Sequence, residues 1–252
     1  MELELKDKVA LVTGSSKGIG KAIANSLKQE NCKIILNGRT NSALKKTAKS
    51  MGENIDYFVA DVTNKKSCLK LQNYILKKYG KLDILVCNVG DGVSTSPGKE
   101  TEKDWEKMLG INLIGTTNMI ETFKKLLTKS NGTVTCISSI AGIETIGAPI
   151  AYATAKSALN TYIKQISVPL AEEKIRINAV VPGNIMFENS VWDKKLKKNP
   201  KKVKNFIKNQ VPLKRFGKPD EIGDLVSFLS SVKASFITGS IFIIDGGQTR
   251  SF

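Results

Sequence analysis

Short runs of β-branched residues alternate with longer amphipathic segments along this 252-residue chain, and this alternation constrains the fold more than any other feature. A strand, a helix and a further strand in succession build a parallel sheet with helices on both faces. Seven strands are predicted, at about 8–13, 33–37, 55–60, 82–87, 133–138, 176–181 and 240–245. Six helices are predicted, at about 18–30, 42–51, 65–79, 102–127, 151–173 and 220–230. We expect residues 1–252 to form a single α/β domain with a doubly wound, seven-stranded parallel sheet.

Two longer irregular stretches, 89–101 and 182–219, each follow a predicted strand directly. Because ligands bind at the carboxyl ends of the strands in such a sheet, both stretches are expected to border the binding site. The chain has no histidine, which excludes Ser-His-Asp and Cys-His catalysis and histidine-built metal sites. We therefore expect no metal, and a proton donor must be a tyrosine, lysine, cysteine or carboxyl group.

A glycine-rich turn lies between the first predicted strand and the first predicted helix. Such glycines allow a tight turn and bring backbone N–H groups and a helix N-terminus close to a pyrophosphate. A plain strand-to-helix turn is the alternative. The turn predicts a Rossmann-type dinucleotide site with contacts from Gly14, Ser16, Lys17, Gly18, Ile19 and Gly20.

The end of the second predicted strand bears on which dinucleotide binds. A site for NAD usually has a carboxylate here to bond the ribose 2′-hydroxyl, but this segment reads Asn37-Gly38-Arg39-Thr40. Arg39 and Lys17 could together hold a 2′-phosphate, since a guanidinium suits phosphate geometry. We predict NADP(H) as the cofactor, with ordinary surface bases as the alternative.

Tyr152 and Lys156 lie four residues apart at the start of a predicted helix, so they share one face of it. The cation and the helix N-terminus are both expected to lower the phenol pKa from about 10 toward the working range of an acid–base catalyst. Ser139 ends the fifth predicted strand, and Asn112 lies among apolar residues of a predicted helix. The structural alternatives are an exposed helical pair for the first two, and a helix cap or satisfied core amide for Asn112.

The chain has 39 Lys and Arg against 23 Asp and Glu, a net charge of +16. Much of the excess is local, because the segment 194–218 contains many bases and no acid. The apolar residues Leu196, Val203, Phe206 and Ile207 among them could form one stripe of a helix, and Pro200 must either start a new helix or break the old one. The segment is either a solvated surface or a receptor for an acidic partner. The bases are Lys194, Lys195, Lys197, Lys198, Lys201, Lys202, Lys204, Lys208, Lys214, Arg215 and Lys218.

Four scattered cysteines, Cys32, Cys68, Cys87 and Cys136, form no Cys-x-x-Cys pair and are expected to be buried, reduced thiols. The first residues are charged, and no apolar run approaches the ~18 residues of a membrane span. We therefore expect a cytoplasmic protein without a membrane segment.

Further motifs occur in the order that is typical of one family. They are Asp61-Val62, Asn88-x-Gly90, Pro182-Gly183 and Asp245-Gly246-Gly247. With the glycine-rich turn, Asn112, Ser139 and the Tyr-Lys pair, they make the chain resemble the short-chain dehydrogenase/reductases from about residue 8 to residue 250. The general pattern is closest to the 3-oxoacyl-acyl-carrier-protein reductases.

The resemblance implies a catalytic set of Asn112, Ser139, Tyr152 and Lys156. Tyr152 would protonate a carbonyl oxygen as hydride arrives, and Ser139 would hold that oxygen. Lys156 would bind the nicotinamide ribose, and Asn112 would anchor a water relay behind it. The resemblance also implies cofactor contacts from Asp61, Val62, Asn88, Gly90, Tyr152, Lys156, Pro182, Gly183 and Ile185.

Two departures from the family pattern affect the cofactor site. The usual Asn-Asn-Ala-Gly is Cys87-Asn88-Val89-Gly90 here, so one amide is lost. The threonine that commonly follows Pro-Gly is absent from Asn184-Ile185-Met186-Phe187. The partner of the nicotinamide carboxamide therefore stays open among Asn184, the Ile185 backbone and Ser190.

From this resemblance we expect an NADP(H)-dependent enzyme that interconverts a ketone and a secondary alcohol, with a 3-oxoacyl thioester as its substrate. Residues 188–218 would form a basic substrate lid that could receive an acidic acyl carrier protein. The alternatives are a sugar or nucleotide-sugar substrate in surface polysaccharide synthesis and, more remotely, a non-catalytic nucleic-acid-binding or NADP-sensing module. We expect no nucleic-acid partner. A homotetramer is implied, with apolar surface from Leu113, Ile120, Tyr162, Ile166 and Leu170.

Overall fold

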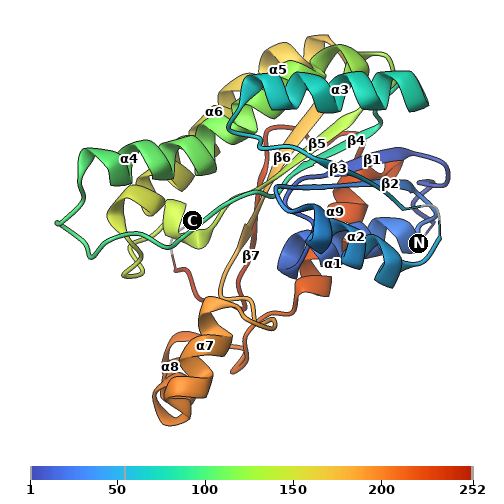
Figure 1. Ribbon diagram of the computed structural model, residues 1–252. Helices are drawn as coiled ribbons and strands as arrows, with labels where there is room; N and C mark the ends of the chain where they lie inside the picture. The colour runs from blue at the N-terminus through green and yellow to red at the C-terminus, as the bar shows by residue number, and fades with distance from the viewer. Residues whose placement is uncertain (1, 54, 251–252) are drawn as a thin grey trace.

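The computed structural model describes residues 2–53 and 55–250, and its strands form one parallel sheet. The spatial order is β3-β2-β1-β4-β5-β6-β7, which confirms the predicted doubly wound, seven-stranded arrangement (Figure 1). The strands are β1 (Val9–Val12), β2 (Lys33–Gly38), β3 (Asp56–Val59), β4 (Ile84–Cys87), β5 (Thr133–Ile137), β6 (Arg176–Pro182) and β7 (Ile241–Ile244). The order reverses between β1 and β4, so the crevice for a ligand opens at the carboxyl ends of these two strands.

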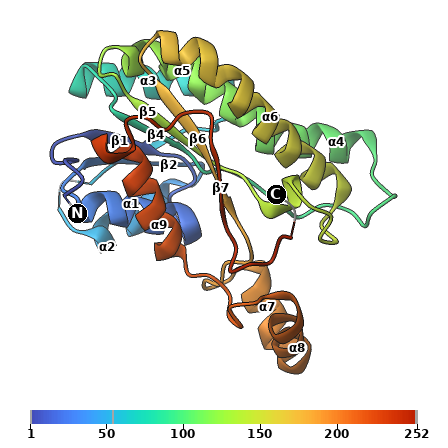
Figure 2. The same cartoon turned by 180° about the vertical axis from the view of Figure 1, so that it is seen from behind.

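Helices cover both faces of the sheet, as Figures 1 and 2 show. The helices α3 (Lys65–Tyr79), α5 (Gly115–Thr128) and α6 (Ile150–Glu172) lie on one face. The helices α1 (Gly18–Gln29), α2 (Asn41–Met51) and α9 (Pro219–Ser230) lie on the other. Because side chains of a strand alternate between faces, Val9 and Leu11 of β1 pack into the first core and Ala10 and Val12 into the second.

The prediction of a single helix at 102–127 is wrong. The structure has α4 (Glu102–Leu109), a π-helical turn at Gly110–Ile114, and then α5. Such turns insert one extra residue and frequently occur at functional sites. This one contains Asn112, whose side chain is fully buried.

The segment predicted to be irregular at 182–219 contains two helices, α7 (Val191–Lys198) and α8 (Pro200–Gln210). Pro200 begins the second helix, as its missing N–H and fixed φ favour. The two helices project from the domain around a small core of their own that includes Val203, Phe206 and Phe216 (Figure 1). We call the segment 188–218 the lid. The stretch at 89–101 is irregular, as predicted.

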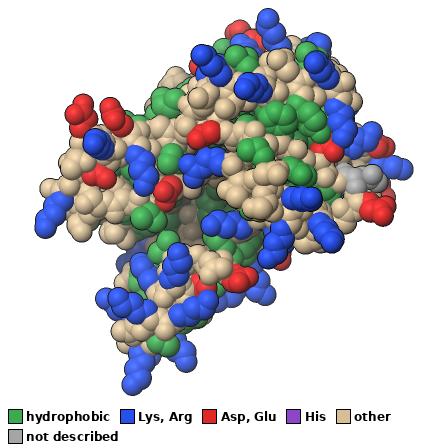
Figure 3. All heavy atoms as spheres, viewed as in Figure 1, with side chains coloured by type: hydrophobic (Ala, Val, Ile, Leu, Met, Phe, Trp, Pro, Cys, Tyr) green, Lys and Arg blue, Asp and Glu red, His purple; other side chains and the backbone are tan. Residues whose placement is uncertain are grey.

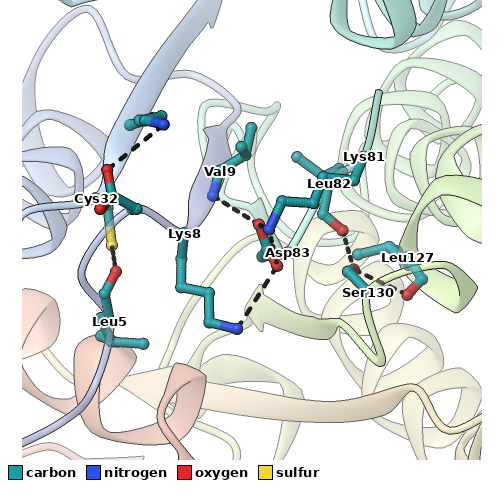
Figure 4. Close-up of polar contacts among 11 residues, drawn as sticks. Leu5, Lys8, Val9, Cys32, Lys81, Leu82, Asp83, Leu127 and Ser130 are labelled. Carbon is teal, nitrogen blue, oxygen red and sulfur yellow. Dashed lines mark hydrogen bonds and ion pairs between the residues drawn. The ribbon is translucent and has the colours of Figure 1, made fainter. Parts of the chain in front are cut away.

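The amino-terminal edge of the sheet is fixed by Asp83 (Figure 4). This buried carboxylate accepts a hydrogen bond from the Val9 backbone N–H at 2.8 Å and lies 3.0 Å from the Lys81 ammonium and 3.7 Å from that of Lys8. It thereby ties β1 to β4, the two strands between which the binding crevice opens.

Several sequence expectations concern burial. All four cysteines are buried and unpaired. Ile120 and Leu170 were expected to supply intersubunit surface, but each lies in the core of the chain itself. Among the described residues no helix is long and apolar enough to cross a membrane.

Candidate active site

The glycine-rich turn lies between β1 and α1 and has the backbone shape that a phosphate cradle requires. Gly14 and Gly18 have φ of 63° and 58°, which side chains disfavour. A β-carbon at Gly20 would lie 2.5 Å from the Gly14 carbonyl oxygen, so the turn closes only with glycine there. The first backbone N–H groups of α1 remain free to bind an anion at this end of the helix.

Asn88 follows β4 and supports this turn. Its side-chain amide donates to the carbonyl oxygens of Thr13 at 3.0 Å and Gly14 at 3.2 Å, and its backbone N–H donates to the Thr13 hydroxyl at 2.9 Å. The sequence motif predicted a cofactor contact for Asn88. In the structure its amide is committed to holding the turn in place.

A cavity of about 500 Å³ opens at the carboxyl edge of the sheet beside this turn. It brings together residues that are far apart in the sequence, and the lid contributes Trp192 and Lys195 to its wall. The predicted site residues that line it are Ile19, Asn88, Gly90, Ser139, Tyr152, Lys156, Pro182, Gly183 and Ile185.

Ser139 and Tyr152 meet inside this cavity. Ser139 follows β5, and its hydroxyl oxygen accepts a hydrogen bond from the Ala141 N–H at 3.2 Å, which leaves the hydroxyl hydrogen for Tyr152. The turn after Ser139 lies very close to α6, because a β-carbon at Gly142 would lie 2.6 Å from the Lys156 carbonyl carbon. Gly142 therefore lets the serine and the tyrosine approach each other.

Lys156 is buried directly behind this pair. Its ammonium donates to the Ile137 carbonyl oxygen at 2.9 Å and lies 6.0 Å from the centre of the Tyr152 ring. Burial lowers the pKa of Lys156 to about 8, since a charge is poorly solvated in the interior.

The prediction that Tyr152 has a lowered pKa is wrong for this structure. Burial raises the pKa of the phenol above its usual value, and the hydrogen bond with Ser139 opposes this rise only in part. The negative charge of Asp91 raises it further. The neutral phenol that results is the form that can donate a proton.

Asn112 does not line the cavity but fixes one of its walls. Its amide nitrogen donates to the carbonyl oxygens of Asp91 and Met108, each at 3.0 Å, and its oxygen accepts from the Asp91 N–H at 3.1 Å. A β-carbon at Gly90 would lie 3.0 Å from the Asn112 oxygen and 3.2 Å from the Lys156 nitrogen. Both side chains therefore approach the backbone at Gly90.

The three candidate partners of the nicotinamide carboxamide, Asn184, the Ile185 backbone and Ser190, follow β6. The Asn184 side-chain oxygen accepts from the Trp192 indole at 2.7 Å, and Ser190 caps α7 by accepting from the Asp193 N–H at 3.0 Å. Ile185 forms a parallel bridge to Gly217 through the polar groups of its two chain neighbours. The N–H and carbonyl of Ile185 itself therefore point away from Gly217. Ile185 lines the cavity, so these two groups remain candidates for the carboxamide.

Phe187 occupies the position beside the glycine-rich turn. A β-carbon at Gly18 would lie 2.7 Å from the Phe187 ring, so the ring lies against the turn. A second cavity of about 570 Å³ lies on the other side of this ring, and Ser16, Lys17 and Gly18 are among its lining residues. Phe187 thus separates the cavity containing Tyr152 from the cavity containing Lys17.

The remaining predicted cofactor residues follow β2 and β3 at the same edge of the sheet. Arg39 is exposed, and the described part of the chain offers it no hydrogen-bond or ion-pair partner. Asp61 accepts from the backbone N–H and the hydroxyl of Thr63, at 2.9 and 2.7 Å, so it stabilises the turn before α3. Val62 is buried against the helix layer.

The glycine cradle would fit the pyrophosphate of a dinucleotide. Lys17 and Arg39, which have no ion-pair partner among residues 2–53 and 55–250, would fit a further phosphate. The backbone polar groups of Ile185, which have no bond within the same residues, would fit the carboxamide. When bound, such a cofactor supplies a hydride. The described residues contain no cluster of three or more Cys, Asp and Glu that could hold a metal ion.

Sequence reasoning missed Asp91 and the wall formed by the lid. Asp91 lines the cavity directly after the Asn88-x-Gly90 motif, so a carboxylate in the loop at the end of β4 was the available signal. The sequence contains no signal that Trp192 and Lys195 reach the cavity, because the contacts of the lid depend on its tertiary packing.

Comparison with known proteins agrees with this geometry. Residues 14–249 match the family model described as enoyl-(acyl carrier protein) reductase. The chain belongs to the short-chain dehydrogenase/reductase family, and it is an oxidoreductase.

Three relatives illustrate the range of the family. The chain is 32% identical over 249 residues to a 3-oxoacyl-[acyl-carrier-protein] reductase FabG of Thermotoga maritima, covering 97% of this chain and 99% of the relative. It is 32% identical over 256 residues to glucose 1-dehydrogenase 2 of Bacillus subtilis, covering 99% and 97%. The crystal structure of L-sorbose reductase from Gluconobacter frateurii, complexed with NADPH and L-sorbose, is similar with a TM-score of 0.93 at 25% identity and full coverage of both chains.

Proposed function

We propose that this protein is an NADP(H)-dependent reductase of a ketone, with a 3-oxoacyl thioester as its substrate. The observation that carries the reaction type is the meeting of Ser139 and Tyr152 in one cavity, with Lys156 buried behind them. No other group of the described chain places a tyrosine hydroxyl, a serine hydroxyl and a buried ammonium beside a glycine cradle.

Reduction requires a hydride at the carbonyl carbon and a proton at the oxygen. Ser139 bonds the Tyr152 hydroxyl in the structure, and its oxygen accepts from the Ala141 N–H. A substrate carbonyl oxygen placed beside both hydroxyls would take over the hydrogen bond that Ser139 donates. Tyr152 then gives its proton to the same oxygen, which its raised pKa allows at neutral pH. Lys156 stabilises the phenolate that remains and offers hydrogen bonds to a cofactor ribose.

The cofactor preference rests on Arg39 and Lys17. Both are exposed, and among the described residues neither has an ion-pair partner. A 2′-phosphate placed between them gains two charge-assisted hydrogen bonds. The NADPH in the L-sorbose reductase structure supports the same choice. Arg39→Asp should weaken NADPH binding by at least tenfold, roughly, and NADH binding little.

The thioester assignment is supported by the relatives and by the lid. Several 3-oxoacyl-[acyl-carrier-protein] reductases match across nearly the whole chain at 32–34% identity. In Figure 3, Lys and Arg side chains surround the lid, and a recess separates it from the body of the domain. Lys195 lies on both the lid and the cavity wall, where it can meet an anionic carrier at the entrance.

A sugar ketone is the second candidate. The observation in its favour is the similarity to the L-sorbose reductase structure over the full length of both chains, together with the glucose dehydrogenase relative. The polar groups of the cavity, Asp91 and Ser139 among them, could bind sugar hydroxyls.

The deciding experiment measures NADPH and NADH oxidation with an acetoacetyl thioester, simple ketones and keto-sugars. Thioester turnover with NADPH that Tyr152→Phe abolishes supports the proposal. Activity confined to a keto-sugar transfers the assignment to the second candidate, and thioester turnover at equal rates with NADH refutes the cofactor preference.

We also propose a cytoplasmic homotetramer, as the unpaired cysteines and the family membership favour. The exposed apolar residues Ile114 and Val168 on the helical layer are suitable for subunit contact, in place of Ile120 and Leu170. Sedimentation equilibrium that shows a monomer would contradict this.

A further inference from the structure

Asp91 is an acidic residue in the cavity wall to which the proposed reaction gives no role. It follows the Asn88-x-Gly90 motif at the end of β4 and lines the same cavity as Ser139 and Tyr152. The next residue is close to the tyrosine, because a β-carbon at Gly92 would lie 3.7 Å from carbon atoms of the Tyr152 ring. The chain at 91–92 therefore forms the wall that faces the proton donor.

The position of Asp91 is fixed from three directions. The buried amide of Asn112 binds both its N–H and its carbonyl oxygen, at 3.1 and 3.0 Å. One carboxylate oxygen accepts from the Val93 N–H at 2.9 Å. The other lies 3.6 Å from the Lys107 ammonium, an ion pair in which the Asp91 side chain is 36% exposed. Lys107 therefore offsets only part of the charge.

The charge of Asp91 reaches the reacting centre. Ser139 contacts the Tyr152 hydroxyl by a hydrogen bond, the Lys156 ammonium lies 6.0 Å from the centre of the Tyr152 ring, and Lys195 lines the same cavity from the lid. Asp91 raises the pKa of Tyr152, whereas Ser139 lowers it. A substrate carbonyl oxygen must occupy the position next to this hydroxyl, so any charge close to that carbonyl experiences the same field.

We propose that Asp91 is a specificity-determining residue whose fixed carboxylate excludes substrates with a negative charge next to the reacting carbonyl. An ester or thioester presents no such charge, whereas the free 3-oxo acid of the same carbon skeleton does. This role rests on the proposed function. By it the site would distinguish the 3-oxoacyl thioester from the free 3-oxo acid that hydrolysis of the thioester produces. The charges of a carrier would meet Lys195 of the lid, which lines the same cavity.

A matched pair of substrates tests the proposal. Ethyl acetoacetate and acetoacetate share their 3-oxo acyl skeleton and differ in one charge and in the ethyl group. The contribution of the ethyl group is common to wild type and variant, so the change in the ratio of their kcat/KM values with NADPH on substitution of Asp91 isolates the effect of the charge. We expect the wild type to prefer the ester and Asp91→Asn to reduce the ratio about threefold to tenfold through faster acetoacetate reduction. Asparagine retains the acceptor for Val93, so the wall keeps its shape.

Two further variants supply the controls. Lys107→Met removes the partial counter-charge and should increase the ratio. Glu102→Gln removes an exposed carboxylate from the same helix as Lys107 and should leave it unchanged. An unchanged ratio in Asp91→Asn, or equal changes in Asp91→Asn and Glu102→Gln, overturns the proposal.

A measurement without turnover separates this inference from the proposed function. The absorbance of tyrosinate is followed during alkaline titration, with the curve of Tyr152→Phe subtracted to isolate one phenol. In Asp91→Asn this step should occur at lower pH than in the wild type and in Glu102→Gln. If the Tyr152 titration occurs at the same pH in Asp91→Asn and in the wild type, the proposed role of Asp91 is overturned. If the titration shifts but neither acetoacetate compound is reduced, only the proposed substrate is overturned.

Discussion

The buried ammonium of Lys156 should make the protein less stable than the same fold without it. Its ordinary pKa of 10.5 falls to about 8 on burial, a difference that corresponds to about 3 kcal/mol of unfavourable free energy for the charged form. Lys156→Met removes the charge at similar volume, but it leaves the Ile137 carbonyl oxygen without its 2.9 Å hydrogen bond, which costs about 1–3 kcal/mol. We expect a net gain of about 0–2 kcal/mol at pH 7, with activity lost.

The pH dependence of this gain identifies its origin. Below pH 8 the lysine is protonated in the folded and unfolded chain alike, so the whole burial cost is present. Between pH 8 and 10.5 the folded wild type releases its proton while the unfolded chain keeps it, so wild-type stability gains relative to Lys156→Met. Urea unfolding of both proteins at pH 7 and at pH 10, without added dinucleotide, measures the difference. A variant less stable than the wild type at pH 7, or a gain that is constant with pH, refutes the reasoning.

Three further outcomes are expected. Asp83→Ala should destabilise the fold by about 2–3 kcal/mol in urea unfolding, because it leaves the Val9 N–H unpaired, whereas Asp83→Asn keeps an acceptor and should cost less. Trp192→Ala removes the ring contacts at 4.6 and 4.7 Å and the bond to Asn184, so limited trypsin digestion should cleave within the lid while the unfolding midpoint of the domain changes little. The rate of NADPH-driven reduction should fall above about pH 8 as Lys156 loses its charge, and a fall that begins only above the ordinary phenol pKa of 10.0 would assign the limit to Tyr152 instead.

The positions of the strands were predictable because most of them are short β-branched or apolar runs. In β1 four buried residues alternate between the two cores. The interruption at Gly110–Ile114 was not predictable, since a π-helical turn has nearly the same apolar periodicity as the helices beside it. The lid helices were obscured by their charge: only one residue of α8, Val203, is buried. Their stability comes from packing around Trp192 and Phe216 rather than from an amphipathic pattern against the main core.

The positions of the proposed catalytic residues were predictable from the sequence, whereas the cavity walls around them were not. Tyr152 and Lys156 are placed by helix periodicity, and Ser139 by the end of a strand, so their meeting follows from local rules and the sheet order. Their protonation behaviour does not follow from those rules. The sequence argument expected the Lys156 cation and the helix N-terminus to lower the phenol pKa. In the structure the ammonium donates to the Ile137 carbonyl oxygen, and burial acts on both groups at once. Burial favours the neutral form of each, so the same low-polarity wall that destabilises Lys156 keeps Tyr152 ready to donate its proton.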